Sequence, residues 1–151
     1  MFLSKQSSAR RPRGLRRSRR RGVATVEFAF ALPALIALTI GTIDLCSMMF
    51  LKESITLAAY EGARRGVGRG RTNADVEARV REFLNERNIN FDGNPCAFSS
   101  PNFNDAETLE NVTTTVTVPV AGNLLIPSVF WGETQLSAQV TLRKEYENLT
   151  N

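Results

Sequence analysis

The segment FAFALPALIALTIGTI, residues 28–43, decides the fold of this chain, because it runs for sixteen residues without a charge. The apolar character resumes after Asp44 as LCSMMFL and ends before Lys52. Residues 28–51 therefore hold 24 residues and one charge, and form a helix roughly 36 Å long at 1.5 Å per residue. The hydrocarbon core of a bilayer is ~30 Å thick, so we expect this segment to cross a membrane, with a bend at Pro33.

The charge of the chain is divided sharply by position. The whole sequence has a net charge of +4, but residues 1–22 carry nine basic groups and no acid, which leaves residues 23–151 with a net charge of −5. Five further basic residues follow the span, at 52, 64, 65, 69 and 71. Because basic residues are retained on the cytoplasmic side, the larger N-terminal cluster predicts a cytoplasmic N-terminus and an outer C-terminal domain.

The composition excludes several classes of function. The absence of histidine removes histidine acid–base catalysis, and the two cysteines, Cys46 and Cys96, form neither a CxxC pair nor a zinc site. A Cys46–Cys96 disulfide stays open as an alternative. The acids Asp75, Glu77, Glu107 and Glu110 fit solvated faces or helix starts, and the arginine-rich arm lacks the interleaved aromatic residues of a nucleic-acid binder. We therefore expect a protein that is not an enzyme and has no cofactor, no small-molecule substrate and no nucleic-acid partner.

Glu27 stands at the entrance of the apolar segment. An acid in lipid is costly unless it has a partner, which makes Glu27 a functional candidate. The alternative is that Glu27 lies at headgroup depth and is simply solvated. The energetics leave both possibilities open, although the length of the apolar run and the acid before it argue against an ordinary cleaved secretory signal.

The residues around Glu27 resemble a known processing site. RRRGVATVEFAFALP, residues 19–33, is similar to the prepilin-peptidase site of type IV pilin-like proteins. In that pattern a basic leader ends in glycine, cleavage follows, and a glutamate stands fifth in the mature chain before an aromatic residue. The resemblance implies cleavage between Gly22 and Val23, with Glu27 fifth and Phe28 sixth.

A second stretch narrows the resemblance to one family. ITLAAYEGARRG, residues 55–66, resembles the AAxEGAR signature of TadE-like proteins, which are minor pseudopilins of the tight-adherence (Tad/Flp) pilus system, and QLSAQVTLRKE resembles that family's C-terminal end. The resemblance covers residues 19–66 most specifically. The signature residues are Ala58, Ala59, Glu61, Gly62, Ala63 and Arg64.

This resemblance implies a structural function. The protein would be cleaved after Gly22 and would take part in assembly of a Tad/Flp pilus for adhesion and surface attachment. Its partners would be the lipid bilayer, the prepilin peptidase, other pilin or pseudopilin subunits and the Tad assembly machinery. The protein would lie in the bacterial inner membrane and cross it once.

Glu27 would pair with the new α-amine of Val23 on a neighbouring subunit and so fix the register between subunits. The alternative function is an uncleaved single-pass anchor that presents a periplasmic binding domain.

Small residues continue the helical pattern beyond the membrane. Ala58, Gly62 and Gly66 recur every four residues and form a ridge that another helix backbone could approach. The alternative is that residues 62–70 fray into a linker. GVGRG, residues 66–70, reads as a hinge, because no strand precedes it as a dinucleotide-binding loop would require.

The remaining residues predict a small outer domain. Thr72 or Asn73 caps a second helix, and residues 88–107 read as a loop. The alternating pattern predicts two strands, one with Val112, Val116, Val118 and Val120 on a face and one with Leu136, Ala138, Val140 and Leu142 on a face. The apolar connection of residues 123–131 either tucks under the sheet or rests on a membrane or a neighbour. The buried helix face is expected at Val76, Val80, Phe83 and Leu84.

The expected fold class is α+β: a long N-terminal transmembrane helix that continues into a stalk, then a small outer domain with one amphipathic helix and a short antiparallel sheet. The expected divisions are a basic leader at residues 1–22, a transmembrane helix at 23–51, a stalk and Gly/Arg hinge at 52–71, and an outer domain at 72–151.

Overall fold

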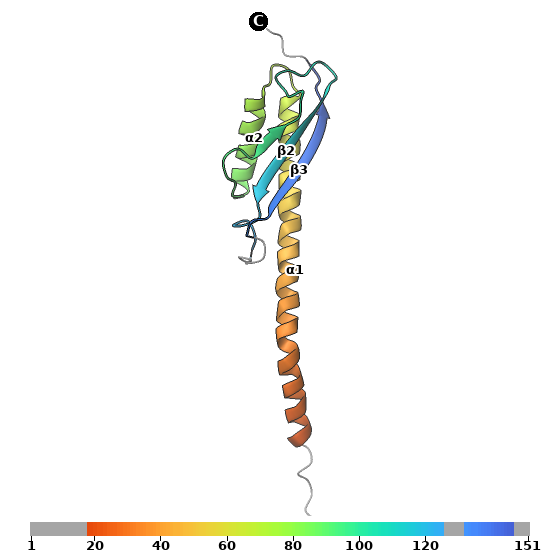
Figure 1. Ribbon diagram of the computed structural model, residues 1–151, viewed down its shortest axis with the longest axis vertical. Helices are drawn as coiled ribbons and strands as arrows, with labels where there is room; N and C mark the ends of the chain where they lie inside the picture. The colour runs from red at the N-terminus through yellow and green to blue at the C-terminus, as the bar shows by residue number, and fades with distance from the viewer. Residues whose placement is uncertain (1–17, 126–131, 147–151) are drawn as a thin grey trace, which may run out of the picture. The chain divides into compact units, whose positions relative to one another are not determined.

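The computed structural model describes residues 18–125 and 132–146, with side chains from residue 22 onward. The elements are α1 (Ser18–Gly66), α2 (Asn73–Glu86), β1 (Cys96–Phe98), β2 (Asn111–Pro119) and β3 (Gln135–Arg143) (Figure 1). The predicted α+β class, with a long apolar N-terminal helix, a second helix and a small antiparallel sheet, is confirmed. Most of the basic leader and the end of the apolar connection, residues 126–131, lie outside the described residues.

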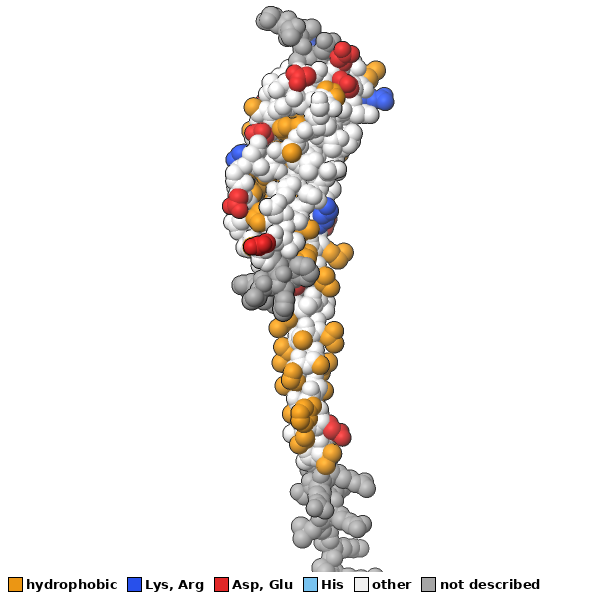
Figure 2. Space-filling model, viewed as in Figure 1, with side chains coloured by type: hydrophobic (Ala, Val, Ile, Leu, Met, Phe, Trp, Pro, Cys, Tyr) orange, Lys and Arg blue, Asp and Glu red, His pale blue; other side chains and the backbone are white. Residues whose placement is uncertain are grey.

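The chain divides into two compact units, residues 1–39 and residues 40–151. In the first unit the described residues form the N-terminal part of α1, which continues through Pro33. The bend expected at Pro33 stays a prediction. Apolar side chains face outward along this part of α1 (Figure 2). Phe30 is 81 % exposed and Leu38 is 69 % exposed. A surface of this kind requires an apolar environment.

From Gly22 onward α1 is long and apolar enough to cross a membrane. None of its most apolar stretch is buried within the protein. This finding rests on length and composition, and it fits a helix that crosses a membrane once. The bounds expected for the span, residues 28–51, stay a prediction.

In the second unit, α2 begins where the sequence predicts. Thr72 is the N-cap, and the Asp75 carboxylate accepts hydrogen bonds from the backbone N–H of Thr72 at 2.9 Å and from its hydroxyl at 3.1 Å. These bonds satisfy one of the free N–H groups of the first turn, and the negative charge is favourable there. The predicted apolar face is confirmed, since Val76, Val80, Phe83 and Leu84 are all buried.

The sheet is antiparallel in the order β1-β2-β3. Both predicted strands are confirmed, and Val112 of β2 lies opposite Leu142 of β3. The expectation of an unbroken loop over residues 88–107 is wrong, because Cys96–Phe98 pair with Thr114–Val116 as a third strand. A strand of three residues is too short for its side-chain alternation to be recognised in the sequence.

The core of the second unit includes the last turns of α1 together with α2 and the sheet. The α1 side chains in this core are Leu51, Ile55, Ala58, Ala59 and Ala63, and Val67 follows directly after the helix. The Lys52 ammonium donates to the Ser137 carbonyl and so links α1 to β3. We call residues 51–67, which are the end of α1 and Val67, together with α2 and the sheet, the head.

The cysteines do not pair. Cys46 is free and exposed on α1, whereas Cys96 is free and buried in β1. The disulfide alternative is therefore wrong for this structure, because the two residues occupy separate environments. Burial, with a smaller effect of nearby Glu77, raises the pKa of the Cys96 thiol to about 12.

Candidate functional site

The residues of the AAxEGAR stretch lie on α1 where α2 packs against it. Ala58, Ala59 and Ala63 are fully buried. Gly62 faces Val76 and Val80 of α2, in a space too small for a side chain. The helix partner anticipated for the small-residue ridge is therefore α2 of the same chain.

Gly66 ends this ridge and is equally enclosed. A Cβ atom at Gly66 would lie 2.6 Å from Val76 Cγ2 and 2.7 Å from the ring of Phe103, well inside van der Waals contact. The alternative that residues 62–70 fray from residue 62 is wrong, because α1 stays helical to Gly66. The two helices approach closely because neither glycine carries a side chain.

The charged members of the stretch lie at the solvent side of the same contact. Glu61 lies 3.9 Å from Arg64 on its own helix and 4.0 Å from Arg79 on α2. Arg79 also donates to Glu82 at 2.9 Å and lies 3.9 Å from Glu86. The hydrogen bond to Glu82 is the main cause that raises the pKa of Arg79. Partly exposed pairs of this kind contribute ~0–1 kcal/mol each, so they orient α2 more than they hold it.

The head also contains a buried lysine, which sequence reasoning missed. Lys144 is fully buried, and its ammonium donates to the Phe103 carbonyl and, at 3.4 Å, to the Arg71 carbonyl. Burial lowers the pKa of Lys144. No sequence signal marks this position, because a lysine after a strand usually points into water.

The residues of the expected processing site lie in the first unit and are accessible. Val23 and Phe28 are each 59 % exposed, and Glu27 is exposed as well. Apart from its chain neighbours and the adjacent helix backbone, no atom of the described residues lies within 4 Å of the position that a Cβ of Gly22 would take. Among the described residues no cation lies within ion-pair distance of Glu27, so its carboxylate can meet a group from outside this part of the chain.

The comparison with known families bears directly on this helix. A family model described as TadE-like protein matches residues 22–64, from Gly22 to the last residue of the AAxEGAR stretch. Residues 22–64 are TadE-like. The predicted resemblance is thus confirmed over this segment. The comparison with curated proteins gave no match. The comparison with solved structures gave none either.

The TadE-like match associates the chain with the Tad pilus, in a family that is structural and not known for enzymatic activity. Together with the apolar helix it fits a single-pass membrane protein.

The acids considered for chemistry have structural contacts. Asp75 caps α2, Glu77 accepts a hydrogen bond from the Asn94 amide at 2.8 Å, and the Glu110 carboxylate accepts one from the backbone N–H of Glu107 at 3.0 Å. Within the described residues no group of three or more acids or cysteines is placed to hold a metal ion. These contacts therefore hold helix and loop geometry in the described part of the chain.

Proposed function

We propose that this protein is a TadE-like pseudopilin, cleaved after Gly22, that takes part in assembly of a Tad/Flp pilus. The observation that carries the proposal is the TadE-like match, which begins at Gly22 and covers an outward-facing apolar helix with Glu27 near its start. The proposed divisions are the leader at 1–22, the span at 23–51, the stalk and hinge at 52–71 and the outer domain at 72–151.

Cleavage would change what the helix can do. The leader carries nine basic groups, and each costs ~2.5–3.5 kcal/mol to place at the centre of a membrane. The uncleaved chain is therefore held in the inner membrane, with its N-terminus in the cytoplasm. Removal of the leader by the prepilin peptidase permits extraction of the subunit from the bilayer toward a pilus.

Glu27 would then fix the register between subunits. The new α-amine of Val23 has a reference pKa of ~7.7–8.0, so it is largely charged near neutral pH. Pairing with Glu27 of a neighbouring subunit neutralises both groups in an apolar bundle, where an unpaired charge costs several kcal/mol. Exposure of Glu27 in the single chain supports this role.

N-terminal sequencing of the membrane-extracted protein tests the cleavage. We expect Val23 as the first residue in cells with an active prepilin peptidase, and the full-length chain for Gly22→Arg. Recovery of only full-length wild-type protein beside the active peptidase would instead support an uncleaved anchor with a periplasmic binding head.

Glu27→Ala tests assembly separately from cleavage. We expect loss of pili with unchanged membrane localisation and unchanged processing. Glu53→Ala is the matched control, since Glu53 is an exposed acid on the same helix, and it should leave piliation intact. Normal piliation of the Glu27 variant would contradict the register role.

A further inference from the structure

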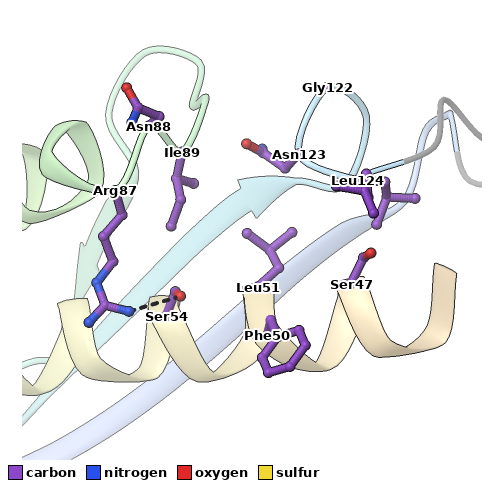
Figure 3. A pocket seen from close by; sticks show the side chains of 11 residues that line it. Ser47, Phe50, Leu51, Ser54, Arg87, Asn88, Ile89, Gly122, Asn123 and Leu124 are labelled. Atoms are coloured by element: carbon purple, nitrogen blue, oxygen red, sulfur yellow. Dashed lines mark hydrogen bonds between the residues drawn. The ribbon is translucent and has the colours of Figure 1, made fainter. Parts of the chain in front are cut away.

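A cavity of about 340 Å³ lies on one side of α1 within the second unit. Three segments line it: the end of the apolar part of α1, the turn after α2, and the loop that follows β2. Figure 3 shows Leu51 and Ser47 pointing from α1 toward this loop, with Ile89 nearby. The lining residues used below are Phe50, Ser54, Arg87 and Leu125.

Arg87 supplies a fixed positive charge at this cavity. Its guanidinium donates to the Ser54 hydroxyl at 3.2 Å (Figure 3) and lies over the ring of Phe83, 4.7 Å from the centroid. Among the described residues no carboxylate lies within 4.0 Å of Arg87, whereas three surround Arg79. An arginine held in place and not neutralised is suited to bind a phosphate group.

The cavity lies at the level where the apolar segment of α1 ends. Phe50 and Leu51 are the last residues of that segment, and Ser54 belongs to the first turn beyond it. A helix that spans a bilayer places this level at the boundary between acyl chains and headgroups. Arg87 beside Ser54 is therefore at the depth where lipid phosphates lie.

Apolar side chains point outward at the same level. Leu125 in the loop after β2 is 80 % exposed, and Phe50 on α1 is 68 % exposed. The loop is thus not tucked under the sheet at Leu125. Apolar side chains beside a cationic group are the composition of a surface that lies on a membrane.

We infer that this cavity is a phospholipid site, in which Arg87 binds the headgroup phosphate while Leu125 and Phe50 contact the acyl chains. The head thereby docks on the membrane surface. The inference requires only that α1 spans the bilayer up to Leu51, so it concerns the membrane-inserted chain and holds whether or not that chain is cleaved.

The depth of the loop tests the docking. The full chain is reconstituted in nanodiscs of phosphatidylcholine and phosphatidylglycerol, with a nitroxide on Leu125→Cys and Cys46→Ser as background. Leu109→Cys is the matched control, because Leu109 is a leucine that is 63 % exposed before the start of β2, while Leu125 follows its end. We expect oxygen to relax the Leu125 label more than an aqueous nickel complex does, and the reverse at Leu109.

Two results of this experiment would overturn the inference. Equal access of the nickel complex to both labels would place Leu125 in water. Protection of the Leu125 label from both reagents would mean that protein covers the loop, as in contact with another subunit.

Lipid retention tests the role of Arg87. In native mass spectrometry of protein released from the same nanodiscs, we expect a retained phospholipid on the wild type and its loss in Arg87→Gln. Arg64→Gln should retain the lipid, since Arg64 is an exposed arginine, with 69 % of its side chain accessible, that does not line the cavity. Equal retention in Arg87→Gln and wild type would overturn the phosphate contact, and the label at Leu125 reports docking independently of that variant.

Discussion

Val80 occupies the space that a side chain at Gly62 would fill, so this glycine sets how closely α1 and α2 approach. The sequence shows the small residues, and their helical spacing indicates a face for another helix. It does not show which helix, because Gly62 and Val80 become neighbours only when the chain turns back after Gly66. The sequence therefore predicts that the two glycines of the ridge contact another helix, but it does not predict which helix.

The first prediction concerns Gly62→Val. Overpacking of a tight contact costs about 1–3 kcal/mol, which outweighs the slightly higher helix propensity of valine compared with glycine. We expect a lower free energy of unfolding of the head, measured by urea titration in detergent. Gly41→Val is the control, since a Cβ at Gly41 would meet no other side chain of the described residues within 4 Å. Partial rescue of Gly62→Val by Val80→Ala is expected, and an unaffected stability of the single variant would contradict the packing.

The second prediction concerns the charge of Asp75. Hydrogen bonds from Thr72, first from its backbone and then from its hydroxyl, hold the pKa of Asp75 below its ordinary value of 3.8. A carboxyl with a lowered pKa stabilises the fold above the unfolded pKa, and that stabilisation is lost as the pH falls through the folded pKa. We expect Asp75→Asn to be less stable than wild type at pH 7, with the difference shrinking below pH ~4. The free energies of unfolding of both proteins, measured at several pH values, test this prediction. A difference between them that does not change with pH would argue against the cap.

The third prediction concerns the reactivity of Cys96. Burial raises the pKa of its thiol to about 12, and only the thiolate is nucleophilic. In a Cys46→Ser background we expect alkylation by iodoacetamide to stay slow up to pH 9, and to become fast when urea unfolds the head. Rapid alkylation of the native protein at pH 8 would show that Cys96 is not enclosed by the core.

At the scale of elements, helices and long strands could be predicted and the short strand could not. The capping residues and the apolar face of α2 are local patterns, and the alternation in β2 and β3 extends over nine residues in each strand. β1 has three residues and exists through its pairing with β2. Its position depends on a contact across the sequence, which no local pattern records.

The fourth prediction separates apolar packing from ion pairs in the docking of α2. Leu84 is fully buried, and Leu84→Ala should cost about 2–5 kcal/mol in unfolding free energy. Arg79→Gln should cost less than about 1 kcal/mol, because its pairs with Glu61, Glu82 and Glu86 are partly exposed. Urea titrations of both variants measure this. A larger loss of unfolding free energy for Arg79→Gln than for Leu84→Ala would mean that the ion pairs, and not apolar packing, hold α2 in place.

At the scale of the whole molecule, the head is built partly from the helix that carries the membrane segment. Five core side chains come from residues 51–66 of α1, and Val67 directly after the helix adds a sixth. Lys144 ties the end of β3 to the carbonyls of Phe103 and Arg71. A small domain has little apolar surface to spare. Its stability therefore depends on the stalk to which it is joined.

The fifth prediction follows from this dependence. A fragment of residues 50–151 should show a cooperative urea transition by near-ultraviolet circular dichroism. Residues 72–151 should not, since that fragment lacks the five α1 side chains of the core and Val67. An equal transition in both fragments would show that the outer residues fold without α1.

The sequence by itself determined the apolar helix, the class of the head, the cap and face of α2 and the TadE-like resemblance, because each is recorded in neighbouring residues or in a short repeat. The tertiary structure alone decided that α2 fills the small-residue ridge, that Cys96 and Lys144 are buried, and that Arg87 stands beside Ser54 at the edge of the apolar segment. These depend on contacts between residues distant in the chain, and such contacts are fixed only when the core closes.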